Sequence, residues 1–231
     1  MLDEVFGKLN RVVVFRWNLF GHELEIGDTI LVTWVIMAVL IVACVLLTRH
    51  LSQDRPSKRQ VLIEWLVQTV RNLLKTSAGS HGDAFVPYIG SLLLYLGLAN
   101  IITMFNFLPF VQIYSPTKDI NVTGTLALMS ILVVLYATFR YKGFKGWLKS
   151  LADPMPMMVP FKLMEYVTKP LSLCLRLFGN VLAAFIIMEI ILGFLPFLGA
   201  PFSVYFDIFD GILQAFIFVY LTTLYIGEAV E

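Results

Sequence analysis

Residues 171–195 read LSLCLRLFGNVLAAFIIMEIILGFL and contain two charged side chains, Arg176 and Glu189. A helix of about 20 mostly apolar residues is long enough to cross the hydrocarbon core of a bilayer. The run extends back through Pro170, and the expected helix, 158–195, would be about 55 Å long against a core of about 30 Å. The stretch therefore predicts a membrane span that is either broken at Pro170 or strongly tilted.

Four further apolar runs of comparable length lie at 29–48, 85–109, 121–139 and 205–227. Of all residues, 58% are hydrophobic and 14% are charged, whereas soluble domains average about 45–50% and about 25%. We therefore expect an all-α polytopic membrane protein with about five transmembrane helices, built as a single membrane domain over residues 1–231.

A helix of a different kind is expected between the first two spans, at 55–78. Leu62, Leu66, Val70 and Leu73 recur at helical spacing and form one apolar stripe, while polar side chains occupy another face. The segment is too polar to span a bilayer. Its period favours an amphipathic helix lying flat on the membrane surface, and packing on a partner is the alternative.

The distribution of lysine and arginine predicts the orientation, because cytoplasmic loops carry an excess of both. Segments 49–75 and 140–162 carry six and five basic residues, whereas the alternating loops 110–121 and 196–206 carry one and none. Five spans with the N-terminal tail (1–28) outside and the C-terminus in the cytoplasm satisfy this distribution.

Several classes of chemistry lack their usual sequence signals. The formal net charge is +1, so no nucleic-acid partner is expected. The chain has no CxxC, HExxH, GxGxxG or GxxxxGK[ST] motif, and we therefore expect no metal site and no cofactor. Cys44 and Cys174 lie inside apolar runs, which favours packed thiols rather than a disulfide.

Arg176 is the side chain least suited to its surroundings, because apolar sequence flanks it on both sides. An arginine at the centre of a membrane helix costs about 2.5–3.5 kcal/mol on insertion scales, and such residues mark ion pathways. On a helix, Asn180 lies about 40° round from Arg176, and Glu189 points to the opposite side about 20 Å along the axis. We interpret Arg176 as an ion-pathway charge. A structural arginine satisfied by helix-end carbonyls or a buried aspartate is the alternative.

The last apolar run carries a second polar stripe. Asp207 and Gln214 are seven residues apart and so point about 20° apart on an α-helix, with Asp210 between them. A line of carboxylates and an amide that enters a membrane helix from one end suggests a water-filled half-channel. The alternative is that Asp207 and Asp210 only cap the start of the helix.

Three motifs carry a family resemblance, and they occur at Leu173–Asn180, Leu213–Phe218 and Pro116–Thr123. The first, LCLRLFGN, closely resembles the LRLFGN segment of subunit a of rotary F-type ATP synthases. The second, LQAFIF, and the third, PTKDINVT, resemble further motifs of that family in the same order. The first hundred residues match the family only in character.

The resemblance implies a stator channel in a bacterial inner membrane, with the c-subunit ring, the b-subunit peripheral stalk and the lipid bilayer as partners. Arg176 would face the ring between two offset half-channels that pass H+ or Na+, and the subunit would have no covalent active site of its own. Wrapping a cylindrical ring favours strong tilt of the last two long helices. Asn180 and Gln214 match polar positions that the family places near the arginine.

The remaining ion-pathway residues are less certain matches. A carboxylate that often follows the arginine by nine residues in the family is replaced here by Phe185, and Glu189 lies one turn further on. Asp207 aligns with an ionisable position that is often histidine. Asp119 and Asn121 of the third motif are expected at the outer ends of the third and fourth spans, where an Asx-type helix cap is the alternative.

A transporter and an enzyme are the alternatives to the stator channel. A stand-alone secondary ion-coupled transporter usually carries internal repeats and helices broken at matched positions, and the sequence contains neither. An intramembrane enzyme would need a nucleophile and base or metal ligands within the spans, but His22, His50 and His81 all lie outside the apolar runs.

Overall fold

The computed structural model describes residues 13–19, 22–49, 57–102, 115–152, 156–194, 202 and 205–230. Its elements follow one another along the chain as β1 (Val13–Leu19), β2 (His22–Gly27), α2 (Asp28–Thr48), α3 (Lys58–Ala78), η1 (Gly79–Phe85), α4 (Val86–Ile101), η3 (Pro116–Lys118), α5 (Ile120–Tyr141), α6 (Gly143–Ala152), η4 (Pro156–Met158), α7 (Val159–Phe194), η6 (Tyr205–Asp210) and α9 (Gly211–Val230).

The prediction of an all-α polytopic membrane protein is confirmed. Within the described residues, five helical segments are long and apolar enough to cross a membrane: Asp28–Thr48, His81–Ile101, Ile120–Tyr141, Val159–Ile191 and Ile208–Val230. The second expected run extended to 109, and its residues 103–109 lie outside the described part. The chain is therefore a multi-pass membrane protein.

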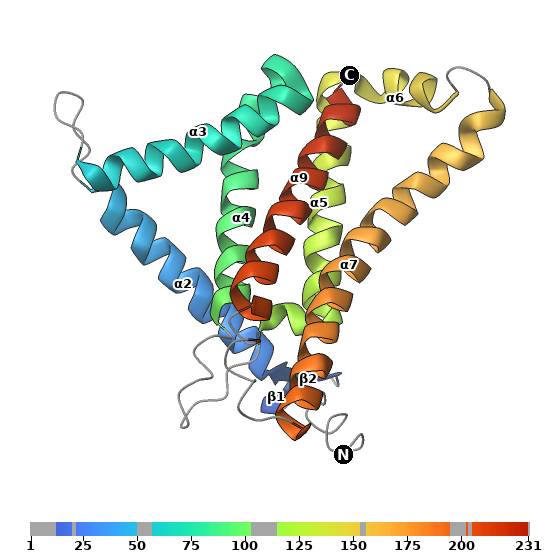
Figure 1. The fold of residues 1–231 in the computed structure, drawn as a ribbon. Helices are drawn as coiled ribbons and strands as arrows, with labels where there is room; N and C mark the ends of the chain where they lie inside the picture. The colour runs from blue at the N-terminus through green and yellow to red at the C-terminus, as the bar shows by residue number, and fades with distance from the viewer. Residues whose placement is uncertain are drawn as a thin grey trace.

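Helices α4, α5 and α9 form the packed centre of the molecule (Figure 1). Their shared core contains side chains that are almost completely buried, among them Leu96, Ile131 and Phe218. Helix α7 packs along α5, and Leu177 contributes to the same core. Helix α2 leans away from the bundle, and only 6% of its membrane window is buried.

Helix α7 is continuous through Pro170 and has 36 residues, so of the two alternatives the break at Pro170 does not occur. In Figure 1 it runs obliquely to α4 and α5. A helix of this length, about 54 Å, has to lie obliquely if its apolar part is to remain within a core of about 30 Å.

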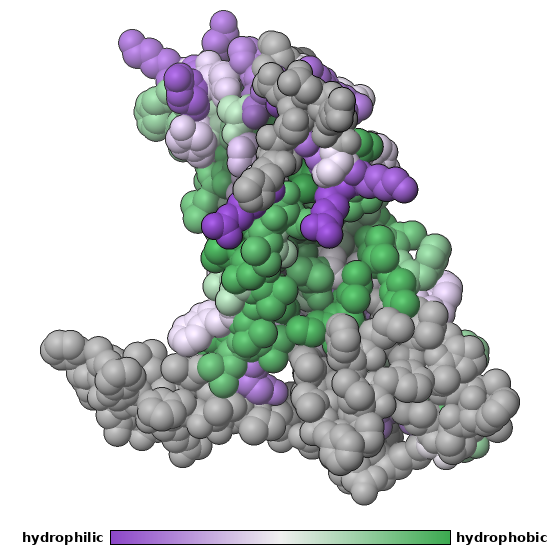
Figure 2. All heavy atoms as spheres, turned by 90° about the vertical axis from the view of Figure 1, so that its left-hand side faces the viewer, coloured by the Kyte–Doolittle hydropathy of each residue, from purple (hydrophilic) through white to green (hydrophobic). Residues whose placement is uncertain are grey.

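Helix α3 crosses one end of the bundle, and α6 lies at that same end (Figure 1). Val70, Leu74 and Ala78 in the C-terminal half of α3 are buried in the core, whereas Leu62 is 68% exposed. The predicted apolar stripe therefore has two parts. Its C-terminal part packs on the core of the chain, and Leu62 in its N-terminal part is exposed. Both basic segments of the sequence come to this end, and Figure 2 shows hydrophilic residues gathered there above a hydrophobic band.

Two elements were not predicted. Helix α6 begins at Gly143, whose φ of 68° lets the chain turn sharply after α5. Strands β1 and β2 form an antiparallel hairpin just before α2, with Leu19 paired to His22. We expected only a tail over 1–28, and this hairpin lies at the end of the molecule opposite α3 and α6 (Figure 1).

Candidate functional site

Arg176 lies in the middle of α7 and its side chain is exposed. Its Nη2 atom makes one long contact, 3.5 Å, with the hydroxyl of Ser172 one turn earlier. Among the side chains that the structure describes, it forms no ion pair with a carboxylate and no hydrogen bond with a helix-end carbonyl. The structural alternative for Arg176 therefore has no support within these residues.

Asn180, one turn beyond Arg176, connects α7 to the last helix. Its Nδ2 atom donates to an Oδ atom of Asp210 at 2.5 Å. Asp210 is the last residue of η6, immediately before α9. Two of the predicted pathway residues are thus in direct contact, although 30 positions separate them in the chain.

Gln214 lies one turn after Asp210 and is buried, with 4% of its surface exposed. Its Nε2 atom has no hydrogen-bond partner among the described residues. Leaving a buried amide unpaired costs about 1–3 kcal/mol. The pair Asp210 and Gln214 therefore places polar atoms inside the bundle where packing alone would favour apolar ones.

A buried polar network that sequence reasoning missed lies beside this pair. Asn100 on α4 donates to the carbonyl of Gly211 at 2.9 Å and accepts from the hydroxyl of Thr117 at 3.0 Å. Ser115 continues the network, because its hydroxyl bonds the Ala99 carbonyl and approaches Thr117 to 2.6 Å. An asparagine inside an apolar run was the signal available for it, since polar residues are rare in membrane spans.

Gly211 is required where this network meets α9. A Cβ atom at this position would lie 2.8 Å from the Cβ of Asn100, too close for two carbon atoms. Asn100 therefore fixes Gly211, the first residue of α9, against α4. Asp210 is the residue immediately before it.

Asp119 and Asn121 form a helix cap at the start of α5. The Asp119 carboxylate accepts from the backbone N–H of Asn121 at 2.9 Å and from its side-chain amide at 3.0 Å. The same carboxylate accepts from the hydroxyl of Thr29 at 3.3 Å, which joins the start of α2 to this corner. The geometry matches the capping alternative.

Lys118, next to that cap, lies over Phe185 of α7, with its ammonium 3.7 Å from the ring centre. Glu189 follows Phe185 by one helical turn and is partly buried. The segment η3 therefore contacts α7 in the turns beyond Asn180, away from Arg176.

Asp207 cannot be placed beside the other residues, because its side chain lies outside the described part of the chain. Its backbone belongs to the π-helical segment η6. A π-helix has i→i+5 hydrogen bonds, so an advance of about 100° per residue does not apply between Asp207 and Asp210. The sequence-based angle of about 20° between Asp207 and Gln214 was wrong for this reason.

Comparison with known proteins gives two findings. Residues 30–227 match the model of the family described as ATP synthase A chain. The chain is also 29% identical to ATP synthase subunit a 1 of Crocosphaera subtropica over 221 residues. The aligned region covers 95% of this chain and 92% of that protein.

Proposed function

The chain belongs to the ATP synthase A chain family, and from this we propose that it is the ion-conducting stator subunit of an F-type enzyme, with two offset half-channels that lead to a c-subunit ring. The observation that carries the proposal is Arg176, an exposed cation within a membrane span that has no carboxylate partner among the described residues. Such a charge favours a partner supplied from outside the described residues.

The proposed partner is a carboxylate on the ring. A fixed guanidinium favours the ionised form of an acid brought beside it, so a loaded site that reaches Arg176 releases its ion. The emptied site takes up an ion from the other half-channel, and only this neutral, reloaded site can rotate through lipid cheaply. Each unit charge that crosses the membrane contributes about 2.3 kcal/mol per 100 mV, and offset half-channels convert that energy into rotation.

We assign the first half-channel to the end of the bundle that carries the β hairpin. The contact of Asn180 with Asp210 and the unpaired amide of Gln214 support this assignment, because they place polar atoms on facing surfaces of α7 and α9. Glu189 and Asp207 are proposed relay groups further toward this end. Asp119 and Asn121 are proposed to shape its wall through their cap on α5.

A subunit of an ATP synthase associates with other subunits of that enzyme. We propose that α7 faces the c-subunit ring and that α2, which the rest of the chain leaves exposed, contacts lipid or the b-subunit stalk. The proposed location is a bacterial inner membrane with the N-terminus outside. Both basic segments would then face the cytoplasm.

The proposal is tested by ion-driven ATP synthesis in vesicles that carry the assembled complex, with wild type compared with Arg176→Ala. We expect normal assembly and a loss of synthesis of at least a hundredfold. Ser172→Ala is the matched control, because it removes the hydroxyl that contacts Arg176 and leaves the arginine charge, and it should retain most of the activity. Near wild-type synthesis by Arg176→Ala would refute the proposal.

A further inference from the structure

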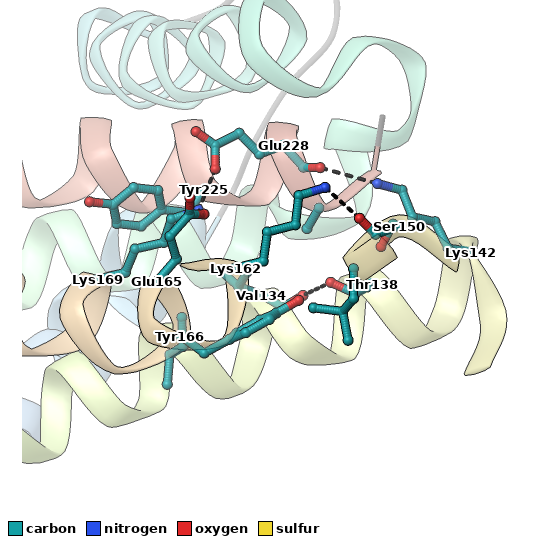
Figure 3. A pocket seen from close by; sticks show the side chains of 13 residues that line it. Val134, Thr138, Lys142, Ser150, Lys162, Glu165, Tyr166, Lys169, Tyr225 and Glu228 are labelled. Atoms are coloured by element: carbon teal, nitrogen blue, oxygen red, sulfur yellow. Dashed lines mark hydrogen bonds and ion pairs between the residues drawn. The ribbon is translucent and has the colours of Figure 1, made fainter. Parts of the chain in front are cut away.

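A pocket of about 220 Å³ opens at the end of the bundle that carries α3 and α6. Helices α5, α6, α7 and α9 line it, and Figure 3 shows its charged side chains converging from α7 and α9 together with Lys142 after α5. Six of its polar lining residues are Lys142, Lys162, Lys169, Glu165, Tyr225 and Glu228. Tyr225 and Glu228 continue, toward the cytoplasmic end, the polar stripe predicted for the last apolar run. The other four are not among the ion-pathway residues that the sequence predicted.

Two of the three lysines donate hydrogen bonds to backbone carbonyls near the ends of helices. Lys162 donates to the carbonyl of Ser150 near the end of α6, and Lys142 donates to the carbonyl of Glu228 near the end of α9 at 3.2 Å. A cation near the C-terminus of a helix offsets the negative end of its dipole. We read these two lysines as supports for the pocket rim.

Lys169 has a different environment, because its ammonium pairs with two carboxylates. Its ammonium lies 2.5 Å from a carboxylate oxygen of Glu228 on α9 and 3.5 Å from one of Glu165 on its own helix. Half of the Glu228 side chain is exposed, so water reaches this pair. The three groups together carry a formal net charge of −1, whereas the whole lining, with Lys142 and Lys162, carries +1.

The same face of α7 leads from the pocket to Arg176. Glu165, Lys169, Ser172, Arg176 and Asn180 all fall within a sector of about 80° at 100° per residue. Lys169 precedes Arg176 by seven residues, which is about 10 Å along the axis. Polar side chains thus continue along one face of the helix from the pocket to the central charge and on to Asp210.

We propose that this pocket is the aqueous vestibule of the second half-channel, and that Glu228 holds the Lys169 ammonium aside so that an ion can pass. The inference rests on the proposed function and adds a route for it. Without the Glu228 carboxylate, Lys169 would keep only the more distant carboxylate of Glu165 as a partner. Its less compensated positive charge would then repel a cation between the vestibule and Arg176.

Access to the vestibule can be measured with two neighbouring residues of α5. Thr138 and Ala137 are both buried, but only Thr138 lines the pocket. In a background with Cys44→Ser and Cys174→Ala, each is replaced by cysteine in the assembled complex. Vesicles with the α3 and α6 end outward are treated with the impermeant cation 2-(trimethylammonium)ethyl methanethiosulfonate.

We expect Thr138→Cys to be labelled at least tenfold faster than Ala137→Cys, with a fall of at least threefold in ion-driven ATP synthesis on labelling. Ser150→Cys, on the α6 wall of the pocket, provides a second position if Thr138→Cys does not assemble. Equal labelling at Thr138→Cys and Ala137→Cys, or labelling that leaves synthesis unchanged, would overturn the vestibule. If Arg176→Ala still abolishes synthesis in that case, the stator function stands and only this route fails.

The role of the ion pair is tested by charge. Glu228→Gln should lower ion conductance at least threefold, because it leaves the Lys169 charge in the route. The double variant Lys169→Met with Glu228→Gln removes both charges and should recover most of the lost conductance. A purely structural pair would give the opposite result, with the double variant no better than the single one, and that outcome would overturn the role assigned to Glu228.

Discussion

Helices α7 and α9 carry most of the proposed pathway residues, but the protein surrounds them very differently. Helix α9 packs against α3, α4 and α5, and Phe218, Val219 and Ile226 on it are almost fully buried. Helix α7 packs mainly on α5 and leaves a long apolar face uncovered, including Leu171 and Leu175 beside Arg176. One helix is held inside the chain, and the other presents a surface to the surroundings.

This difference separates stability from function. A side chain added to or removed from α9 changes contacts within the chain, so the fold itself should respond. A change on the exposed face of α7 alters nothing within the chain, so only the interaction with a neighbour should respond. Four substitutions test this division, and SDS-induced unfolding in mixed micelles measures the stability of each.

Gly227→Ala on α9 should have the largest effect on stability. A Cβ at this position would lie 2.2 Å from the backbone oxygen of Ser77 on α3, and a backbone atom cannot rotate away. Overpacking typically costs about 1–3 kcal/mol, and we expect the upper end of that range together with poor assembly. An unchanged unfolding midpoint would mean that α3 and α9 are not in close contact.

Asn100→Ala should lower the unfolding free energy by about 2 kcal/mol, because it removes two buried hydrogen bonds, one from the Thr117 hydroxyl and one to the Gly211 carbonyl. Asn72→Ala is the control, since Asn72 is an exposed amide on α3 and surface changes usually stay within about 0.5 kcal/mol. Equal losses for the two variants would contradict the role of Asn100 in fixing α9.

Gln214→Leu should leave the fold as stable as wild type or up to about 1 kcal/mol more stable, because the removed amide nitrogen has no hydrogen-bond partner among the described residues. Ion-driven synthesis should nevertheless fall several-fold if the amide serves the pathway. A loss of stability above about 2 kcal/mol would show instead that this amide is structural.

Gly179→Ala on α7 should have the smallest effect on stability. Nothing lies within 4 Å of a Cβ added there, and alanine favours a helix by up to about 1 kcal/mol over glycine. It is the matched counterpart of Gly227→Ala on the exposed helix. A marked loss of stability in the isolated subunit would break the distinction between the two helices.

The sequence predicted the spans well because a bilayer demands about 20 apolar residues in each, and such runs are visible without any tertiary information. Arg176 stood out for the same reason, as a charge with no nearby helix end. The oblique path of α7 through Pro170 also followed from its length.

The features that sequence reasoning missed depend on contacts between distant segments. The bond from Asn100 to Gly211 joins residues 111 positions apart, and the pair of Lys169 with Glu228 joins residues 59 positions apart. Helical periodicity describes one helix at a time and contains no information on such pairs. The hairpin β1–β2 was missed because the tail before the first span was considered only for its charge.

The π-helical turn Tyr205–Asp210 has a consequence for how this helix varies among related chains. A π-helical turn holds more residues than an α-helical turn, so a deletion of one residue there could restore regular α-helix. Such a deletion would rotate everything before it by about 100° about the axis and leave Gln214 and the rest of α9 in register with α4. The numbering of the outer carboxylate relative to the LQAFIF motif is therefore expected to differ by one between relatives with and without this turn. Alignments that keep the outer carboxylate at a fixed spacing from the LQAFIF motif would then pair residues that do not occupy the same place.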